Sequence, residues 1–189
     1  MKRFSIASLG TLAVIATIPF VAEMPVLADL RDAGVAITQN IQRQPQVALR
    51  LGADKKVIRK DQQGKQQVAW QTLQGNVVVK PGDVLRYAVT GKNNSNAAVR
   101  NLVVTQPIPK QTIYVLNSVA VKNNKAKVTY SIDNGKSFVE KPTVQVKLAN
   151  GKVETRPAPA ALYTHVRWKF EEPISPAIAV NASYQVRIR

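Results

Sequence analysis

The residue types that carry most enzymatic chemistry are scarce in this chain and scattered along it. The chain has one histidine, His165, and no cysteine, so disulfides, thiolate metal sites and cysteine nucleophiles are excluded. Alternation around His165 places it on the polar side of a strand, where an exposed structural histidine is the expected role. No spacing singles out two carboxylates that could face each other across a cleft, as glycoside hydrolysis requires. We therefore expect no catalytic residue, no metal site and no cofactor.

The segment Asp133-Asn134-Gly135 superficially resembles part of a calcium-binding loop, but the full Asp-x-Asp-x-Asp-Gly pattern is absent. An alternating apolar run, 126–132, precedes the segment, and Phe138-Val139 follows it. Asn-Gly between such runs is the strongest short hairpin signal. The sequence therefore predicts a hairpin turn here rather than a metal site.

The composition is strongly basic. Lysine and arginine total 27 against 11 aspartate and glutamate, which gives a formal charge of +16. Such a field favours polyanions, namely acidic polysaccharide, anionic lipid headgroups or nucleic acid. Nucleic acid is not the expected partner, because the chain has no recognition helix, zinc finger or aromatic RNA-binding motif.

The first residues have the organisation of a secretory signal peptide. Lys2-Arg3 supplies a positive start, an apolar run covers 6–16, and Val26-Leu27-Ala28 supplies a small-residue cleavage site. We predict a signal peptide over residues 1–28, with cleavage after Ala28 or, alternatively, after Ala22. The protein is then exported to the periplasm, the cell surface or the extracellular space.

A membrane-anchoring helix is the other interpretation of this start. Two prolines and a glutamate within 19–25 interrupt the apolar run well short of the ~20 residues that a bilayer-spanning helix needs. We expect no transmembrane helix in the mature chain. Residues 29–46 are polar and rich in glutamine, which predicts a flexible N-terminal arm, and residues 47–189 suit one domain.

The stretch 81–118 organises this domain. Leu85, Tyr87 and Val89 alternate with polar residues, a turn-forming run follows at 92–96, and Pro107 and Pro109 close the next strand. Further alternating runs follow at 126–132, 144–148, 164–170 and 180–188. A first strand is expected at 47–52 and another around Val68 and Trp70, with 55–65 as a solvated loop or hairpin between them. This pattern of roughly eight to ten short strands without a helix predicts an all-β sandwich or barrel.

An ordered set of short motifs in this stretch resembles a bacterial surface repeat, the domain of unknown function eleven, which is an immunoglobulin-like conserved-repeat module. The motifs are Pro81-Gly82-Asp83, Tyr87, Asn93-Asn94, Leu102-Val103-Val104, Ile108-Pro109 and Tyr114, with weaker echoes at Val166-Arg167-Trp168 and Tyr184-Gln185-Val186. The resemblance covers roughly 68–189. It implies an immunoglobulin-like antiparallel β-sandwich at the cell envelope and carries over no catalytic residue.

The chain departs from that family in three respects. Gln106-Pro107 stands where the family usually has an acidic residue before its proline corner, and Ser175-Pro176-Ala177 replaces a Pro-Gly pair. The family often forms tandem arrays, whereas one copy is present here. An extended adhesive stalk is therefore not expected.

The polar sides of the last two strands suggest a binding face. His165, Arg167 and Lys169 lie on one strand, and Arg187 and Arg189 on the other, with no acid among them. If these strands pair, the five side chains lie side by side and form a polyanion-binding face. The alternative interpretation is that they form an ordinary solvated surface. Because like charges opposite one another destabilise a sheet, such an arrangement would suggest an anionic partner.

The aromatic residues are expected in the core rather than in a sugar-stacking platform. Trp70, Trp168, Tyr87, Tyr130 and Tyr184 fall mostly on apolar faces, and Val186 and Ile188 are expected to pack against Val166 and Trp168.

We therefore predict a non-catalytic structural or binding module of the bacterial envelope that contacts anionic polysaccharide or another envelope component. The alternative is a periplasmic hydrolase or an accessory subunit of an envelope enzyme. A cleft with His165 bonded to Glu140 or Glu154 would favour that alternative.

Overall fold

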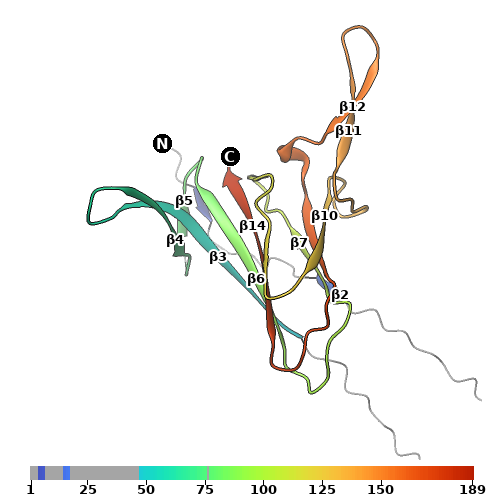
Figure 1. The fold of residues 1–189 in the computed structure, drawn as a ribbon. Helices are drawn as coiled ribbons and strands as arrows, with labels where there is room; N and C mark the ends of the chain where they lie inside the picture. The colour runs from blue at the N-terminus through green and yellow to red at the C-terminus, as the bar shows by residue number, and fades with distance from the viewer. Residues whose placement is uncertain (1–3, 7–14, 18–46, 76) are drawn as a thin grey trace, which may run out of the picture.

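The computed structural model of the protein describes residues 4–6, 15–17, 47–75 and 77–189 (Figure 1). In these residues the regular structure consists of antiparallel β-strands and one short 3-10 turn, η1 (Ala160–Leu162). The all-β, antiparallel prediction is confirmed. No helix in the described part of the chain is long and apolar enough to cross a membrane.

Two short strands fall within the predicted signal peptide. β1 (Phe4–Ile6) pairs with β5 (Val77–Val79), and β2 (Ile15–Thr17) pairs with β7 (Val103–Pro107). The cleavage site after Ala28 and the predicted flexible arm, 29–46, lie outside the described residues. Removal of residues 1–28 therefore stays a prediction.

Most of the described strands belong to two antiparallel sheets. The six-stranded sheet has the order β4-β3-β6-β14-β8, with β9 also paired to β14. Its strands are β3 (Val47–Lys60), β4 (Gln66–Thr72), β6 (Val84–Asn93), β8 (Thr112–Tyr114), β9 (Ala120–Lys122) and β14 (Ala179–Ile188). The four-stranded sheet has the order β10-β13-β7-β2, with β10 (Ala126–Ser131) and β13 (His165–Phe170).

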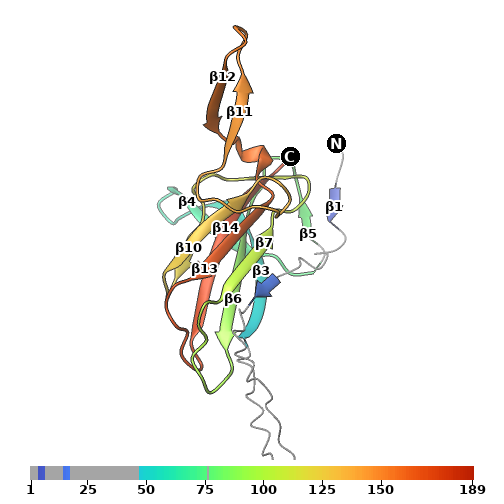
Figure 2. The ribbon, with the colours of Figure 1, turned by 90° about the vertical axis from the view of Figure 1, so that its right-hand side faces the viewer.

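A separate hairpin stands clear of both sheets. β11 (Thr143–Lys147) pairs only with β12 (Val153–Pro157) among the described strands, and both views show it projecting from the body (Figures 1 and 2). The turn that joins them contains the Asn150-Gly151 pair, where Gly151 adopts a φ of 81° that favours glycine. Asn-Gly between two alternating runs is a strong hairpin signal, and here the pair marks the turn.

The basic stretch 55–65 is a hairpin and not an open loop. β3 continues through it to Lys60 and pairs with β4 from Asp54↔Thr72 to Lys60↔Gln66. The turn is closed by Asp61, whose Oδ1 accepts hydrogen bonds from the backbone N–H groups of Gln63 (3.0 Å) and Lys65 (2.9 Å). Aspartate is common in turns because its side chain can accept hydrogen bonds from the backbone amides of the same turn.

The core contains buried side chains from both sheets and is rich in aromatic rings. Trp168 on β13 is 0% exposed, and its ring centroid lies 6.0 Å from that of Tyr184 on β14. Tyr184 in turn stacks on Tyr87 of β6 at 5.6 Å. Val186 is also 0% exposed, whereas Ile188 is only partly buried against the same core, so the predicted burial is confirmed for Val186 and holds in part for Ile188. Trp70 is an exception, because it lies half-buried on the outward face of β4.

The last two strands do not pair with each other, which corrects the prediction that placed them side by side. β13 pairs with β10 and β7, whereas β14 pairs with β6, β8 and β9. The connection 171–178 crosses from one sheet to the other, and Val99↔Ile174 bridges it to the rest of the fold. Two prolines in this connection, Pro173 and Pro176, disfavour a tight hairpin.

We expect the buried tyrosines to make the fold sensitive to alkali. Burial raises the pKa of Tyr114 and Tyr184, and for Tyr114 a hydrogen bond with Tyr130 adds to this effect. A raised folded-state pKa contributes stability below the unfolded pKa of about 10, and this stability is lost as the pH rises above it. Urea unfolding at about pH 8 and about pH 11 is expected to show this loss. Tyr184→Phe should weaken the pH dependence, and an unchanged dependence would contradict the assignment.

Candidate functional site

One face of the six-stranded sheet collects basic side chains. Successive residues of a strand point to opposite sides, so Arg86 points outward because Leu85 and Tyr87 are buried inside. The registers of the neighbouring strands extend this assignment across the sheet. The basic outward residues, which we call the basic sheet face, are Arg50, Lys56, Lys60, Arg86, Lys92, Lys122 and Arg187.

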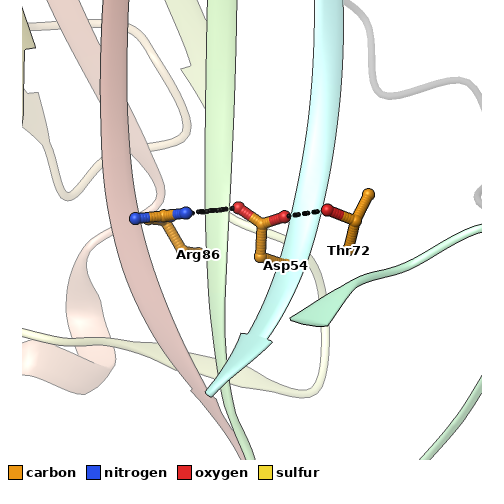
Figure 3. Close-up of polar contacts among 3 residues, drawn as sticks. All are labelled: Asp54, Thr72 and Arg86. Atoms are coloured by element: carbon orange, nitrogen blue, oxygen red, sulfur yellow. Dashed lines mark hydrogen bonds and ion pairs between the residues drawn. The ribbon is translucent and has the colours of Figure 1, made fainter. Parts of the chain in front are cut away.

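Asp54 is the acidic residue among the described outward positions of these strands, and it is fully engaged (Figure 3). Its Oδ2 accepts hydrogen bonds from Arg86 Nη2 (2.7 Å) and Nε (3.1 Å). Its Oδ1 accepts one from Thr72 Oγ1 at 3.0 Å. The Arg86 guanidinium also lies 4.4 Å from the ring centroid of Trp70. No ion pair joins the other basic residues of this face to an acid in the described part of the chain.

A row of small residues crosses the middle of the basic sheet face. Gly52, Ala88, Ser183 and Ala120 lie opposite one another on four neighbouring strands. On one side of this row, Arg50 and Lys122 stand at the two ends of a second row. The inner members of that second row are Thr90 and Asn181, and Thr90 Oγ1 donates to Asn181 Oδ1 at 2.7 Å. The small residues thus form a flat lane bordered by basic and polar side chains.

The five residues predicted to form one binding face are divided between the two sheets. His165, Arg167 and Lys169 lie on β13 and point away from the core on the four-stranded sheet. Arg187 belongs to the basic sheet face, and Arg189 follows the end of β14, where it is exposed. The prediction that these side chains lie together is therefore wrong, since their strands belong to different sheets.

Arg167 is held in place by neighbours on the four-stranded sheet. Its Nε donates to Thr105 Oγ1 at 3.0 Å, and its guanidinium carbon lies 3.4 Å from the ring centroid of Phe138. Burial lowers the pKa of Arg167 from its ordinary value. Nearby, Lys127 is ion-paired to Glu140 at 2.6 Å, so this face carries less unpaired charge than the basic sheet face.

His165 has a structural environment. Its Nδ1 lies 3.1 Å from Thr164 Oγ1, and its ring packs over Gly135, where an added Cβ would come within 3.3 Å of it. Burial lowers the pKa of His165, and the charge of Arg167 adds to this effect while Asp133 opposes it. Of the two glutamates considered as its partners, Glu140 pairs with Lys127 and Glu154 pairs with Arg156.

Asp133 closes the turn that follows β10. Its Oδ1 accepts hydrogen bonds from Ser131 Oγ (2.6 Å) and from the Ser137 N–H (3.0 Å), and its Oδ2 accepts one from Ser137 Oγ. The hydrogen bond from Ser131 is the largest cause that holds the pKa of Asp133 well below its usual range. The isolated bridge Tyr130↔Val139 spans this turn, so the predicted turn is confirmed, although Phe138-Val139 forms no return strand.

No protein-family model, curated protein or solved structure matches this chain. The structure defines the class of protein: it is an all-β protein of antiparallel sheets, one of which carries a basic face. Sequence reasoning missed Arg50, Lys92 and Lys122 as members of this face. The position of Arg50 between Leu49 and Leu51 signals an outward direction, but only the strand order shows that the three residues share a sheet.

Proposed function

We propose that this protein is an exported, non-catalytic binding module of the bacterial envelope, and that its basic sheet face binds an acidic polysaccharide. The observation that carries the proposal is the charge distribution on that face. Basic residues stand on most of its strands, while its acid, Asp54, is engaged by Arg86 and Thr72. A linear polyanion laid across the strands would meet several unpaired cations at once.

The flat lane supports an extended ligand. The row from Gly52 to Ala120 carries only small side chains, so a polymer chain would lie close to the backbone of the sheet. Thr90, Asn181 and Gln185 beside it supply hydroxyl and amide groups, which are ordinary partners for sugar hydroxyls. A surface that combines neutral hydrogen-bonding groups with separated cations suits a carboxylated sugar polymer.

We further propose that the two sheets form an immunoglobulin-like β-sandwich of the kind that the motif resemblance implies. Side chains from both sheets share one core, in which Trp168 of the four-stranded sheet lies against Tyr184 of the six-stranded sheet. Such a framework presents two outward faces and holds their side chains at fixed spacing. Export, which rests on the predicted signal peptide, would place the basic face among envelope polymers.

The proposal is tested by comparing two triple variants that remove equal charge from different sheets. Arg50→Gln, Lys92→Gln and Lys122→Gln change the basic sheet face, whereas Lys127→Gln, Arg167→Gln and Lys169→Gln change the four-stranded sheet. We expect the first variant to bind polygalacturonate about tenfold more weakly than the parent, and the second to change binding much less.

Binding should also weaken steeply with salt, because the charges are exposed and screened beyond about 8 Å at physiological ionic strength. Uncharged dextran serves as the control ligand and should not bind. Equal losses of affinity in the two triple variants would indicate attraction by net charge alone. The absence of binding to polygalacturonate at low salt would contradict the proposal. A separate measurement tests export. The intact mass of protein recovered from the native envelope should show a chain that begins at Asp29.

A further inference from the structure

The outer part of the β3–β4 hairpin has an unusual environment. β6 pairs with β3 only as far as Lys55, so beyond that point β3 and β4 have no other strand beside them in the described part of the chain. This two-stranded ribbon, residues 56–60 and 66–70, extends away from the rest of the sheet (Figure 1). Isolated two-stranded ribbons are marginally stable in water, so a surface that covers one face would stabilise it.

The outward face of the ribbon carries an apolar patch. Ile58 is 66% exposed, and Val68, directly opposite it on β4, is 58% exposed. Trp70 lies next to Val68 on the same face and is half-buried beneath the guanidinium of Arg86. Large aliphatic side chains are also exposed elsewhere in the molecule, but here two of them face each other beside a tryptophan.

Basic side chains frame this patch. Lys56 and Lys60 lie on either side of Ile58 on the same face of β3, and both are exposed. The nearby acid, Asp61, accepts hydrogen bonds from the backbone of Gln63 and Lys65 and from Gln67 Nε2, so it is engaged within the turn. The patch is thus apolar at its centre and positively charged at its margin.

We propose that the outward face of this ribbon docks on an anionic lipid bilayer. Lysines at the margin match phosphate headgroups, while Ile58 and Val68 reach the acyl boundary and Trp70 lies at the interface, where tryptophan is favoured. A polysaccharide offers anionic groups but little hydrocarbon to cover Ile58 and Val68. Lys56 and Lys60 belong to the basic sheet face, but they lie on rows away from the lane and its bordering cations Arg50 and Lys122. The lipid contact is therefore separate from the lane.

The two tryptophans make a direct test possible with the full-length protein. Trp70 lies on the ribbon, and Trp168 is 0% exposed in the core, so Trp168 serves as an internal reference. Vesicles of phosphatidylglycerol and phosphatidylcholine should shift the emission to shorter wavelength, and brominated lipid should quench it. Trp70→Phe should abolish both effects, and vesicles of phosphatidylcholine alone should produce neither.

Paired variants separate the apolar contribution from the electrostatic one. Ile58→Ser with Val68→Ser should weaken vesicle binding about tenfold. The matched control, Val153→Ser with Ile178→Ser, removes two exposed aliphatic side chains elsewhere and should leave binding unchanged. Lys56→Gln and Lys60→Gln should each weaken it about fivefold at low salt.

The outcomes distinguish this inference from the proposed function. Binding to polygalacturonate without binding to anionic vesicles would overturn the inference and leave the proposed function standing. Vesicle binding that is unaffected by the two serine substitutions would also overturn it. Self-association in the absence of lipid that these substitutions abolish would instead assign the patch to a second copy of the chain. Vesicle binding without polygalacturonate binding would support the inference and contradict the proposed function.

Discussion

Replacement of Trp168 by alanine is expected to lower the free energy of unfolding by about 3–5 kcal/mol, the usual cost of a large-to-small aromatic change in a core. Trp168 is 0% exposed in the core that both sheets share, with its ring centroid 6.0 Å from that of Tyr184. Its removal would leave a cavity at the point where β13 faces β14. Because the sheets meet through such contacts, the loss should affect the whole fold.

Urea denaturation of the two proteins provides the measurement, and Trp70→Ala provides the control. Trp70 is the same residue type but lies half-buried on the outward face, where its ring lies beneath the guanidinium of Arg86. We expect Trp70→Ala to cost about 1 kcal/mol, the range of an exposed cation–π pair. Equal losses in the two variants would contradict the placement of Trp168 at the centre of the core.

Replacement of Asn93 by aspartate is expected to cost about 3 kcal/mol or more at neutral pH. Asn93 is 0% exposed at the end of β6, and its Nδ2 donates to the carbonyls of Ala97 (2.7 Å) and Ile174 (2.8 Å). Its Oδ1 accepts hydrogen bonds from the backbone and the hydroxyl of Ser95. A carboxylate keeps the accepting role but faces the two carbonyls without a proton to donate.

The aspartate variant should be less destabilised at low pH. Burial beside carbonyl oxygens would raise the folded-state pKa of this carboxyl above its unfolded value of about 3.9. The stability linked to the protonated form is then present below that value and is lost as the pH rises through the folded pKa. Thermal midpoints at several pH values measure the effect. Asn94→Asp, at the exposed neighbouring position, is the control and should change the midpoint little.

The strand that ends at Asn93 illustrates what the local sequence determines. Alternation of Leu85, Tyr87 and Val89 with polar residues predicted the β6 strand, because its side chains must separate between core and solvent. The turn after Asn93 was predicted from residue types that tolerate turn geometry. Asn134-Gly135 and Asn150-Gly151 likewise marked their turns, because a positive φ costs glycine and asparagine little.

The strand pairing was decided by tertiary structure. Alternation shows that Arg167 and Arg187 each point outward, but it does not show on which sheet. The connection 171–178 is long enough to cross from β13 to the other sheet, and this crossing separates the two arginines. The same long-range pairing places Arg50 and Lys122 on one row, although they are distant in the chain.

The burial of individual polar residues also could not be predicted from the sequence. Gln106 precedes a proline at the end of a strand, a position that suggests no burial, yet it is 0% exposed on β7. Its amide atoms have no hydrogen-bond partner among the residues that the structure describes. Local alternation therefore determined the strands, the turns and the direction of most side chains. The shared face and the depth of each residue depend on pairing between distant segments, which is set by the packing of both sheets around Trp168 and Tyr184.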